Sequence, residues 1–123
     1  METRTVVPDA GPFETFPNPA PQRGYIITHH CTEWTSICPV TGAPDFGKLE
    51  IQYIGGERLV ELKSLKLWLQ SFRDKGIYYE QVTNLLLDEL VKYLSPRWMR
   101  IEATFTVRGG IYSVIVAEHG KRS

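Results

Sequence analysis

The sequence has few cysteines, no net charge and no long apolar run. Its 123 residues hold two cysteines, and 14 acidic side chains balance 14 basic ones. So few cysteines exclude a disulfide-dense secreted scaffold. A net charge of zero gives no reason to expect a nucleic acid or an acidic membrane surface as a partner. No apolar run approaches the roughly 20 residues of a membrane-spanning helix, and the N-terminus does not resemble a signal peptide. We therefore expect one cytoplasmic domain with reduced thiols.

Proline is concentrated at the start of the chain. Five of the eight prolines lie in the first 22 residues, which show no apolar periodicity. This composition predicts an extended arm over residues 1–22, poorly ordered unless it docks, with Phe13 and Phe16 as candidate docking points. Residues 23–118 are expected to form a single domain. Residues 119–123 form a charged tail that is expected to fray.

The remaining patterns predict, in order, two strands, two helices and two strands. The strand segments are rich in β-favouring residues or alternate strictly, and the helical segments carry apolar stripes at helical spacing. Gly109-Gly110 is typical of a two-residue hairpin turn. The six elements are expected over residues 23–30, 48–55, 61–75, 80–94, 99–107 and 111–117.

This order predicts an α+β fold with the arrangement ββααββ. Antiparallel hairpins would form one sheet, and both helices would cover the same face of it. The other face and the open sheet edges would be liabilities for a lone subunit. We therefore expect an oligomer in which subunits join edge to edge and close a larger barrel.

A loop rich in turn formers is expected over residues 35–47, between the first two strands. It carries Cys38 and Asp45, seven residues apart. A thiol in a sharply turned loop with an acid nearby is typical of a nucleophile with a proton donor. An ordinary connecting loop would also fit, with a small buried cysteine and an aspartate that makes a turn hydrogen bond. The loop alone leaves both interpretations open.

The first helix is expected to carry cations near its N-terminus. Lys63 and Lys66 are three residues apart and share a face, beside the hydroxyl of Ser64. The free N–H groups and partial positive charge of a helix N-terminus favour anions, so these residues could bind a phosphate. A solvated polar face is the alternative interpretation.

Three further charged side chains have two interpretations each. Glu80 begins the second helix, where it is either a first-turn acid or an acceptor for two N–H donors of a flat heterocycle, with Glu61 as a second such anchor. Arg108 stands at the hairpin tip, as either a solvated turn residue or an anion contact.

A metal site is the less favoured interpretation of the histidines and cysteines. His29 and His30 are adjacent on a predicted strand and point to opposite faces, so at most one would join Cys31 and Cys38. The usual zinc spacings are absent. We prefer the interpretation that these histidines lie at a strand end and pack near a contact between subunits.

Three longer stretches occur in a specific order. They are EWTSICPVTGAPDF at residues 33–46, ELKSLKLW at 61–68 and RGGI at 108–111. Together they resemble the cysteine loop, the nicotinamide-cofactor motif and a third element of the NADPH-dependent 7-cyano-7-deazaguanine reductases. The resemblance runs from residue 25 onward and is to the short, single-module form. Tyr79 departs from the pattern, because the family usually has His before the glutamate of the second helix.

The resemblance implies a fold and a reaction. The fold is the tunnelling fold shared with GTP cyclohydrolase I, built into oligomeric barrels such as a decamer of two pentameric rings. The reaction is reduction of the nitrile of 7-cyano-7-deazaguanine to a primary amine in queuosine biosynthesis, with two NADPH per turnover and no metal. Cys38 would attack the nitrile to form a covalent thioimide, and Asp45 would donate the proton.

The resemblance also implies the binding residues. The deazapurine would be bound by Val60, Glu61, Leu62, Tyr79 and Glu80. The cofactor would be bound by Lys63, Ser64, Lys66, Arg108 and Gly109.

Two rival functions are considered. A pterin-type cyclohydrolase on the same fold would need a metal and a catalytic histidine set that the spacing here does not supply. A non-catalytic binding or assembly module would leave Cys38 unreactive towards iodoacetamide and would not consume NADPH.

Overall fold

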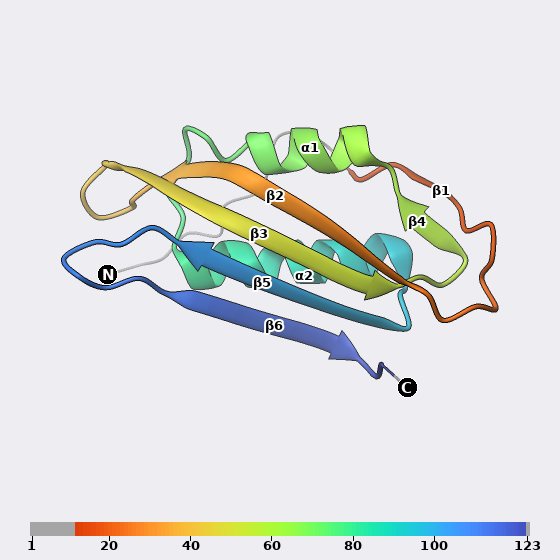
Figure 1. Cartoon of the computed structure of the whole chain (residues 1–123). Helices are drawn as coiled ribbons and strands as arrows, with labels where there is room; N and C mark the ends of the chain where they lie inside the picture. Colours follow the sequence, from red (N-terminus) through yellow and green to blue (C-terminus); the bar gives the residue numbers. More distant parts are fainter. Residues whose placement is uncertain (1–11, 123) are drawn as a thin grey trace.

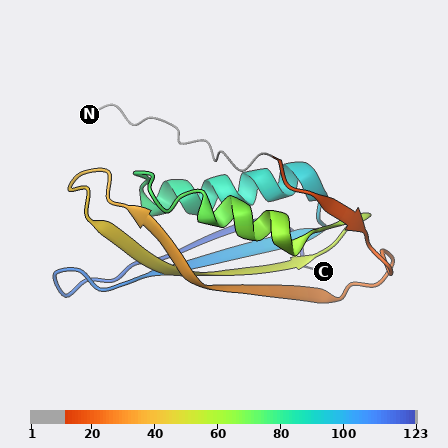
Figure 2. The same ribbon diagram turned by 90° about the horizontal axis from the view of Figure 1, so that it is seen from above.

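The computed structural model describes residues 12–122, so about half of the predicted arm lies outside the described residues. The elements are β1 (Thr15–Pro17), β2 (Ile26–Ile37), β3 (Pro44–Ile54), β4 (Arg58–Val60), α1 (Leu62–Gln70), α2 (Tyr79–Leu94), β5 (Trp98–Phe105) and β6 (Val114–Gly120). Four strands form an antiparallel sheet in the order β2-β3-β5-β6, and β1 pairs with β4 in a separate two-stranded sheet. Both helices cover one face of the larger sheet, as predicted (Figures 1 and 2). No helix within 12–122 is both long and apolar enough to cross a membrane.

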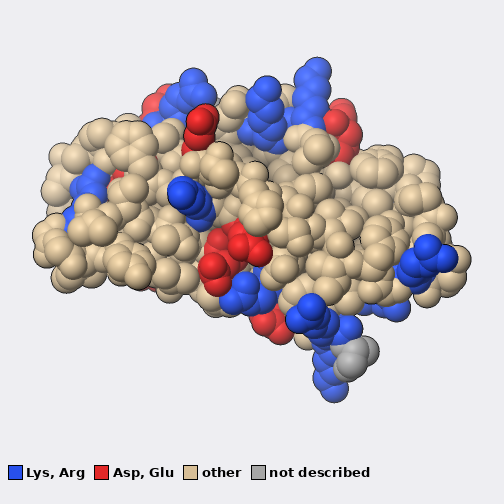
Figure 3. Space-filling model, in the orientation of Figure 1, with Lys and Arg blue, Asp and Glu red and all other residues tan. Residues whose placement is uncertain are grey.

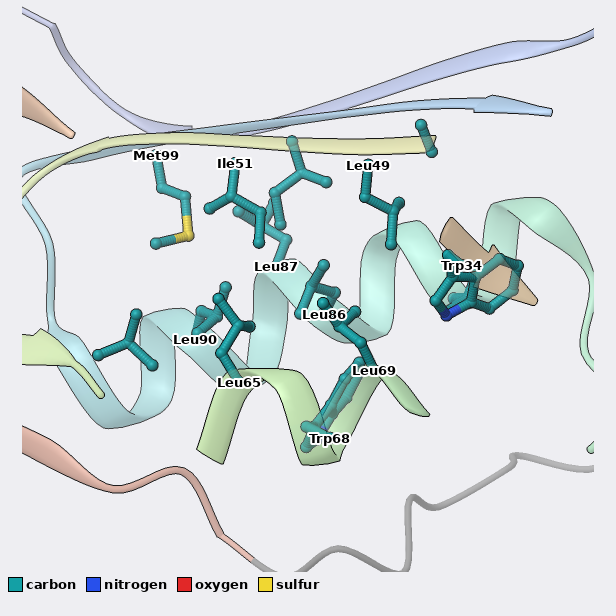
Figure 4. Packing of buried hydrophobic residues seen from close by; sticks show 14 of the residues in the cluster. Trp34, Leu49, Ile51, Leu65, Trp68, Leu69, Leu86, Leu87, Leu90 and Met99 are labelled. Carbon is teal, nitrogen blue, oxygen red and sulfur yellow. The ribbon is translucent and has the colours of Figure 1, made fainter. Parts of the chain in front are cut away.

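The core lies between the inner face of the sheet and the two helices. On β3 the predicted alternation is confirmed, because Leu49, Ile51 and Tyr53 are buried while the residues between them are partly exposed. Figure 4 shows Leu49, Ile51 and Met99 pointing from the strands toward the helices. One sheet face is therefore committed to the core, and the strand register cannot slip by one residue without exposing it.

Helix α1 is shorter than predicted and begins one residue later. The carboxylate of Glu61 caps it by accepting hydrogen bonds of 2.8 Å from the backbone N–H groups of Lys63 and Ser64. The helix ends at Gln70, where the predicted span ran to residue 75, because the chain turns at Ser71. The Ser71 hydroxyl donates to a carbonyl of the last helical turn. Leu62, the first residue of the helix, is 59% exposed and is not part of the buried face of α1.

The cysteine loop is also shorter than predicted. Ladder pairing between β2 and β3 continues to the pair Ile37 and Pro44, so the connection spans only residues 38–43. Sheet hydrogen bonding thus overrides the turn formers at both ends of the predicted loop. Pro44 fits at the start of a strand, where its missing N–H costs little. Cys38 remains in the loop, whereas Asp45 lies on β3.

The last strand corrects the prediction of a frayed tail. β6 runs to Gly120 and pairs His119 with Met99 and Gly120 with Trp98, so the prediction is wrong for these two tail residues. Gly120 has a φ of 77° and lies so close to the carbonyl of Arg97 that a Cβ there would be 2.2 Å from its oxygen. A side chain would not fit at this position. The hairpin turn at Gly109-Gly110 is confirmed, with φ values of 57° and 79°.

The described part of the arm is docked on the domain. Phe13 is 5% exposed and stacks on Trp68 of α1 with ring centroids 5.3 Å apart. The backbone of Glu14 bonds the backbone N–H of Glu61 and the hydroxyl of Ser64. Docking through Phe13 is therefore confirmed, whereas Phe16 is 43% exposed.

Because Phe13 fills a buried site against α1, we expect Phe13→Ala to lower the free energy of unfolding by about 3–5 kcal/mol. The matched change Phe16→Ala removes a side chain that is 43% exposed, and we expect a loss below about 1 kcal/mol. Urea unfolding of both variants at one fixed protein concentration measures the difference. Equal losses would show that the ring of Phe13 contributes no more than an exposed side chain.

Candidate active site

The loop that carries Cys38 is held against the start of α2. Ile37 donates its backbone N–H to the carbonyl of Lys75 at 3.0 Å, and Ile77 donates to the carbonyl of Ile37 at 3.3 Å. Within the loop, Cys38 donates to the carbonyl of Ala43 at 2.8 Å. Backbone hydrogen bonds thus fix Cys38 on both sides, and the β2–β3 loop lies at the sheet end where α2 begins (Figure 1).

The loop stabilises the thiolate form of Cys38. Hydrogen bonds from the Thr41 hydroxyl, from the Thr41 backbone and from the Val40 backbone lower the pKa of the thiol, in that order of importance. Partial burial and the negative charge of Asp45 act in the opposite direction and raise it. Because the thiolate is the nucleophilic form, these donors make Cys38 more reactive at neutral pH.

Asp45 is a buried acid with two donors on one oxygen. Its side chain is almost fully enclosed, and Oδ1 lies 2.9 Å from the hydroxyl of Tyr79 and 2.8 Å from Nη2 of Arg108. Nη2 of Arg108 also donates to the carbonyl of Pro44. Strand β3, the first turn of α2 and the β5–β6 hairpin therefore meet at this carboxyl.

Tyr79 is oriented by its ring. It stacks on Phe105 with centroids 3.8 Å apart and planes 8° from parallel. Burial raises the pKa of the Tyr79 phenol, and the hydrogen bond to Asp45 and the charge of that residue raise it further. The hydroxyl therefore stays protonated and remains a donor at neutral pH.

Two more predicted residues lie at the same end of the molecule. Glu80 follows Tyr79 in the first turn of α2 and is exposed. Gly109 lies at the hairpin tip, where an added Cβ would meet nothing within 4 Å. The structure therefore brings six of the predicted site residues to one end of the sheet: Cys38, Asp45, Tyr79, Glu80, Arg108 and Gly109.

The other predicted residues lie on β4, at the cap of α1 and on α1, which begins at the opposite end. The backbone N–H of Val60 donates to the hydroxyl of Tyr53 at 3.2 Å, and Tyr53 is eight residues along β3 from Asp45. At about 3.3 Å per strand residue the two ends are roughly 26 Å apart. Within one chain, the structure does not bring Val60, Glu61, Leu62, Lys63, Ser64 or Lys66 to Cys38.

Two of these residues already have structural partners. The carboxylate of Glu61 is occupied by the N-terminal N–H groups of α1, and Oγ of Ser64 accepts from Glu14 and donates to the carbonyl of Glu61. Lys63 and Lys66 are exposed. Figure 3 shows basic side chains along the edge of the molecule that α1 forms. Anion binding there would rest on the two ammonium groups, because Glu61 already holds the helix N-terminus.

A groove of about 610 Å³ lies between β2 and α1 and was not predicted. Lys66 lines it, together with His29, His30 and Cys31. Burial lowers the pKa of His29 and raises the pKa of Cys31. No group of three His, Cys, Asp or Glu side chains within residues 12–122 is placed to hold a metal ion. The absence of a metal requirement stays a prediction.

Comparison with known proteins identifies the family. A family model described as QueF-like protein matches residues 44–123. Three relatives are each named NADPH-dependent 7-cyano-7-deazaguanine reductase. That of Anaeromyxobacter sp. (strain Fw109-5) is 52% identical over 89% of this chain and 90% of its own length. That of Magnetococcus marinus is 47% identical over 94% and 91%, and that of Thiobacillus denitrificans is 54% identical over 89% and 78%.

The chain belongs to the QueF-like protein family.

The predicted fold class is confirmed by a solved structure. The crystal structure of the archaeosine synthase QueF-Like in the apo form matches with a TM-score of 0.72, over 78% of this chain and 94% of that one. The two sequences are only 20% identical, so this match shows the shared fold.

Sequence reasoning missed three residues of this QueF-like site. Thr41 follows Cys38 by three residues in a turn, a spacing that could have suggested a hydrogen bond to the sulfur. Phe105 stacks on Tyr79, and no local signal marks that contact. Ser36 lies directly opposite Asp45 in the β2–β3 ladder, and its buried hydroxyl has no partner among the described residues.

Because the Thr41 hydroxyl is the largest contribution that lowers the pKa of Cys38, we expect Thr41→Val to raise that pKa. Alkylation of Cys38 by iodoacetamide should then need a higher pH, and should be slower than in the unchanged protein at any pH below the midpoint. Peptide mass mapping across a pH series distinguishes Cys38 from Cys31. Thr41→Ser keeps the hydroxyl and serves as the control; identical profiles for the valine and serine variants would contradict the expectation.

Proposed function

We propose that this protein reduces the nitrile of 7-cyano-7-deazaguanine to a primary amine, with NADPH as the reductant. The names of relatives about half identical over nearly the whole chain support this activity. The observation that carries it is the pairing of an activated thiol, Cys38, with a buried carboxyl, Asp45, at one end of the sheet. The product would serve queuosine biosynthesis.

The first step needs both groups. A nitrile is a poor hydride acceptor, so the sulfur of Cys38 attacks its carbon and forms a thioimide. The nitrile nitrogen takes a proton from Asp45, whose Oδ2 is the carboxyl oxygen that Tyr79 and Arg108 leave free. The hydroxyl of Ser36, buried opposite Asp45, could supply a further hydrogen bond on this side.

NADPH supplies the two hydrides that conversion of a nitrile to an amine requires, so two molecules are consumed per turnover. Lys63 and Lys66, exposed on the first turns of α1, would bind its phosphates, with Ser64 beside them. Gly109 leaves open space for close approach of an anion at the hairpin tip. Arg108 is also predicted to bind this cofactor, a contact that would require the guanidinium to leave Asp45.

Two groups of residues would bind the substrate. Glu80 is exposed beside Tyr79 and could accept two N–H groups from the guanine-like edge. Val60, Glu61 and Leu62 would line the base pocket, but Val60 contacts Tyr53, which lies roughly 26 Å along β3 from Asp45 in the same chain. A complete site therefore needs the α1 end of one copy beside the Cys38 end of another.

We propose that the protein is a homo-oligomer. β2 and β6 are the outer strands of the larger sheet, and each has one edge that no strand of the described chain covers. Val114 and Val116 on β6 are about half exposed. Joining these edges would extend the sheets into a barrel, such as a decamer of two pentameric rings. Both cysteines are free thiols, which suits the cytoplasm. No direct contact with nucleic acid or a membrane is proposed.

Formation of the thioimide does not need the cofactor. We therefore expect intact-mass spectra of the protein mixed with 7-cyano-7-deazaguanine alone to show an added mass equal to that of the nitrile. Cys38→Ala should show no adduct and no nitrile-dependent NADPH oxidation, whereas Cys31→Ala, which keeps the nucleophile, should behave like the unchanged protein. An active Cys38→Ala variant would overturn the proposed mechanism.

A site shared between copies predicts complementation. Cys38→Ala alone and the double change Lys63→Ala with Lys66→Ala should each lose activity. Oligomers reassembled from equal amounts of the two should regain up to about a quarter of full activity, since that share of sites has an intact half from each copy. Failure to regain activity in oligomers shown to be mixed would mean that each site is built within one chain.

A further inference from the structure

We propose that Arg108, together with Tyr79, is a positioning residue for Asp45 in the addition of Cys38 to the nitrile. This inference rests on the proposed function and deepens it. It gives Arg108 a role in the step that precedes any hydride transfer, separate from the cofactor contact that the sequence analysis assigns to it.

Arg108 contacts two neighbouring residues at the start of β3. Its Nη2 reaches both Oδ1 of Asp45 and the carbonyl of the preceding residue, Pro44, so it holds the side chain of one residue and the backbone of its neighbour. The hairpin that carries Arg108 is closed by two backbone hydrogen bonds to Ile111, of 2.7 and 3.0 Å. The guanidinium is therefore directed from a short, closed turn.

Tyr79 donates to the same oxygen from α2. Stacking on Phe105 fixes the plane of its ring, and its hydroxyl donates to Oδ1 of Asp45 at 2.9 Å. Two donors on one carboxyl oxygen restrict rotation of the group. They also leave Oδ2 as the atom on which a transferable proton can reside.

The charges near Asp45 are consistent with a positioning role for Arg108. Three ionisable groups of the described chain interact with Asp45: Cys38 from the loop, Tyr79 from α2 and Arg108 from the hairpin. An ionised Asp45 opposes ionisation of Cys38. The guanidinium of Arg108 offsets that negative charge, and it also stabilises Asp45 as a carboxylate that can accept a proton.

The proton balance of the step then closes without an added reagent. Asp45 takes the thiol proton of Cys38 on Oδ2, and the sulfur forms a bond to the nitrile carbon. One π bond between carbon and nitrogen breaks, and its electron pair accepts the proton from Oδ2. The sum is addition of S–H across the nitrile, and Asp45 returns to the carboxylate that pairs with Arg108.

The test is the rate of adduct formation with 7-cyano-7-deazaguanine in the absence of NADPH, measured by absorbance and intact mass between pH 5 and 9. We expect Arg108→Gln and Tyr79→Phe each to slow it at least about tenfold, because misplaced acid–base groups commonly cost that much or more. In Arg108→Gln the pH profile of this rate should change, because the variant removes the positive charge beside the Asp45 carboxyl. Arg108→Lys, which keeps the charge, should restore the pH profile of the unchanged protein.

Matched controls test whether the effect depends on these two positions or on the loss of any arginine or tyrosine hydroxyl. Arg23→Gln removes another exposed arginine, and Tyr112→Phe removes another hydroxyl, from an exposed residue just past the Arg108 hairpin turn; both should react like the unchanged protein. Circular dichroism checks that each variant folds. If Arg108→Gln does not fold, Arg108→Lys and Tyr79→Phe carry the test, because Tyr79→Phe keeps the ring stack.

The outcomes are distinct. If Arg108→Gln forms the adduct at the unchanged rate and pH profile, and only its KM for NADPH rises, Arg108 is a cofactor contact and the inference is wrong. An unchanged rate in Tyr79→Phe would remove Tyr79 from the positioning pair. If the unchanged protein forms no adduct at all, the proposed function itself fails.

Discussion

A buried carboxyl at the start of β3 constrains the reactive end of this protein. Asp45 is 3% exposed, and an unpaired charge at such a depth would cost several kcal/mol. Its partners, Tyr79 and Arg108, come from α2 and from the β5–β6 hairpin. Satisfying this single group therefore brings three separate parts of the chain to the loop that carries Cys38. The same contacts that offset the cost of burial also hold the carboxyl group in place.

The long central strand, β3, keeps other predicted site residues away from the Cys38 loop. β3 runs between the Cys38 end and the end where β4 leads into α1, and a strand cannot be shortened without breaking its ladder. The base-pocket residues Val60, Glu61 and Leu62 are thus held far from the thiol in one subunit. The predicted site residues thus form two groups toward opposite ends of one sheet. This separation suits an oligomer in which each site combines one group from each of two neighbouring copies.

Several features followed from the sequence because they depend on neighbours along the chain. The alternation on β3, the apolar face of α2 and the Gly109-Gly110 turn each come from local spacing, and all three are present. The family likewise followed from three ordered motifs, and the relatives confirm it. Such features depend on side-chain periodicity and turn geometry, which a short segment determines by itself.

Other features depended on partners far away in the sequence. The strands β2 and β3 extend into the predicted loop because each supplies the other's hydrogen bonds, and β6 extends into the predicted tail because β5 is there to pair with it. The sequence alone determined the family, the order of elements and the chemical groups present. Only the tertiary structure decided that Arg108 and Tyr79 share one oxygen of Asp45, because residues 34 or more positions apart meet only when the sheet and helices pack.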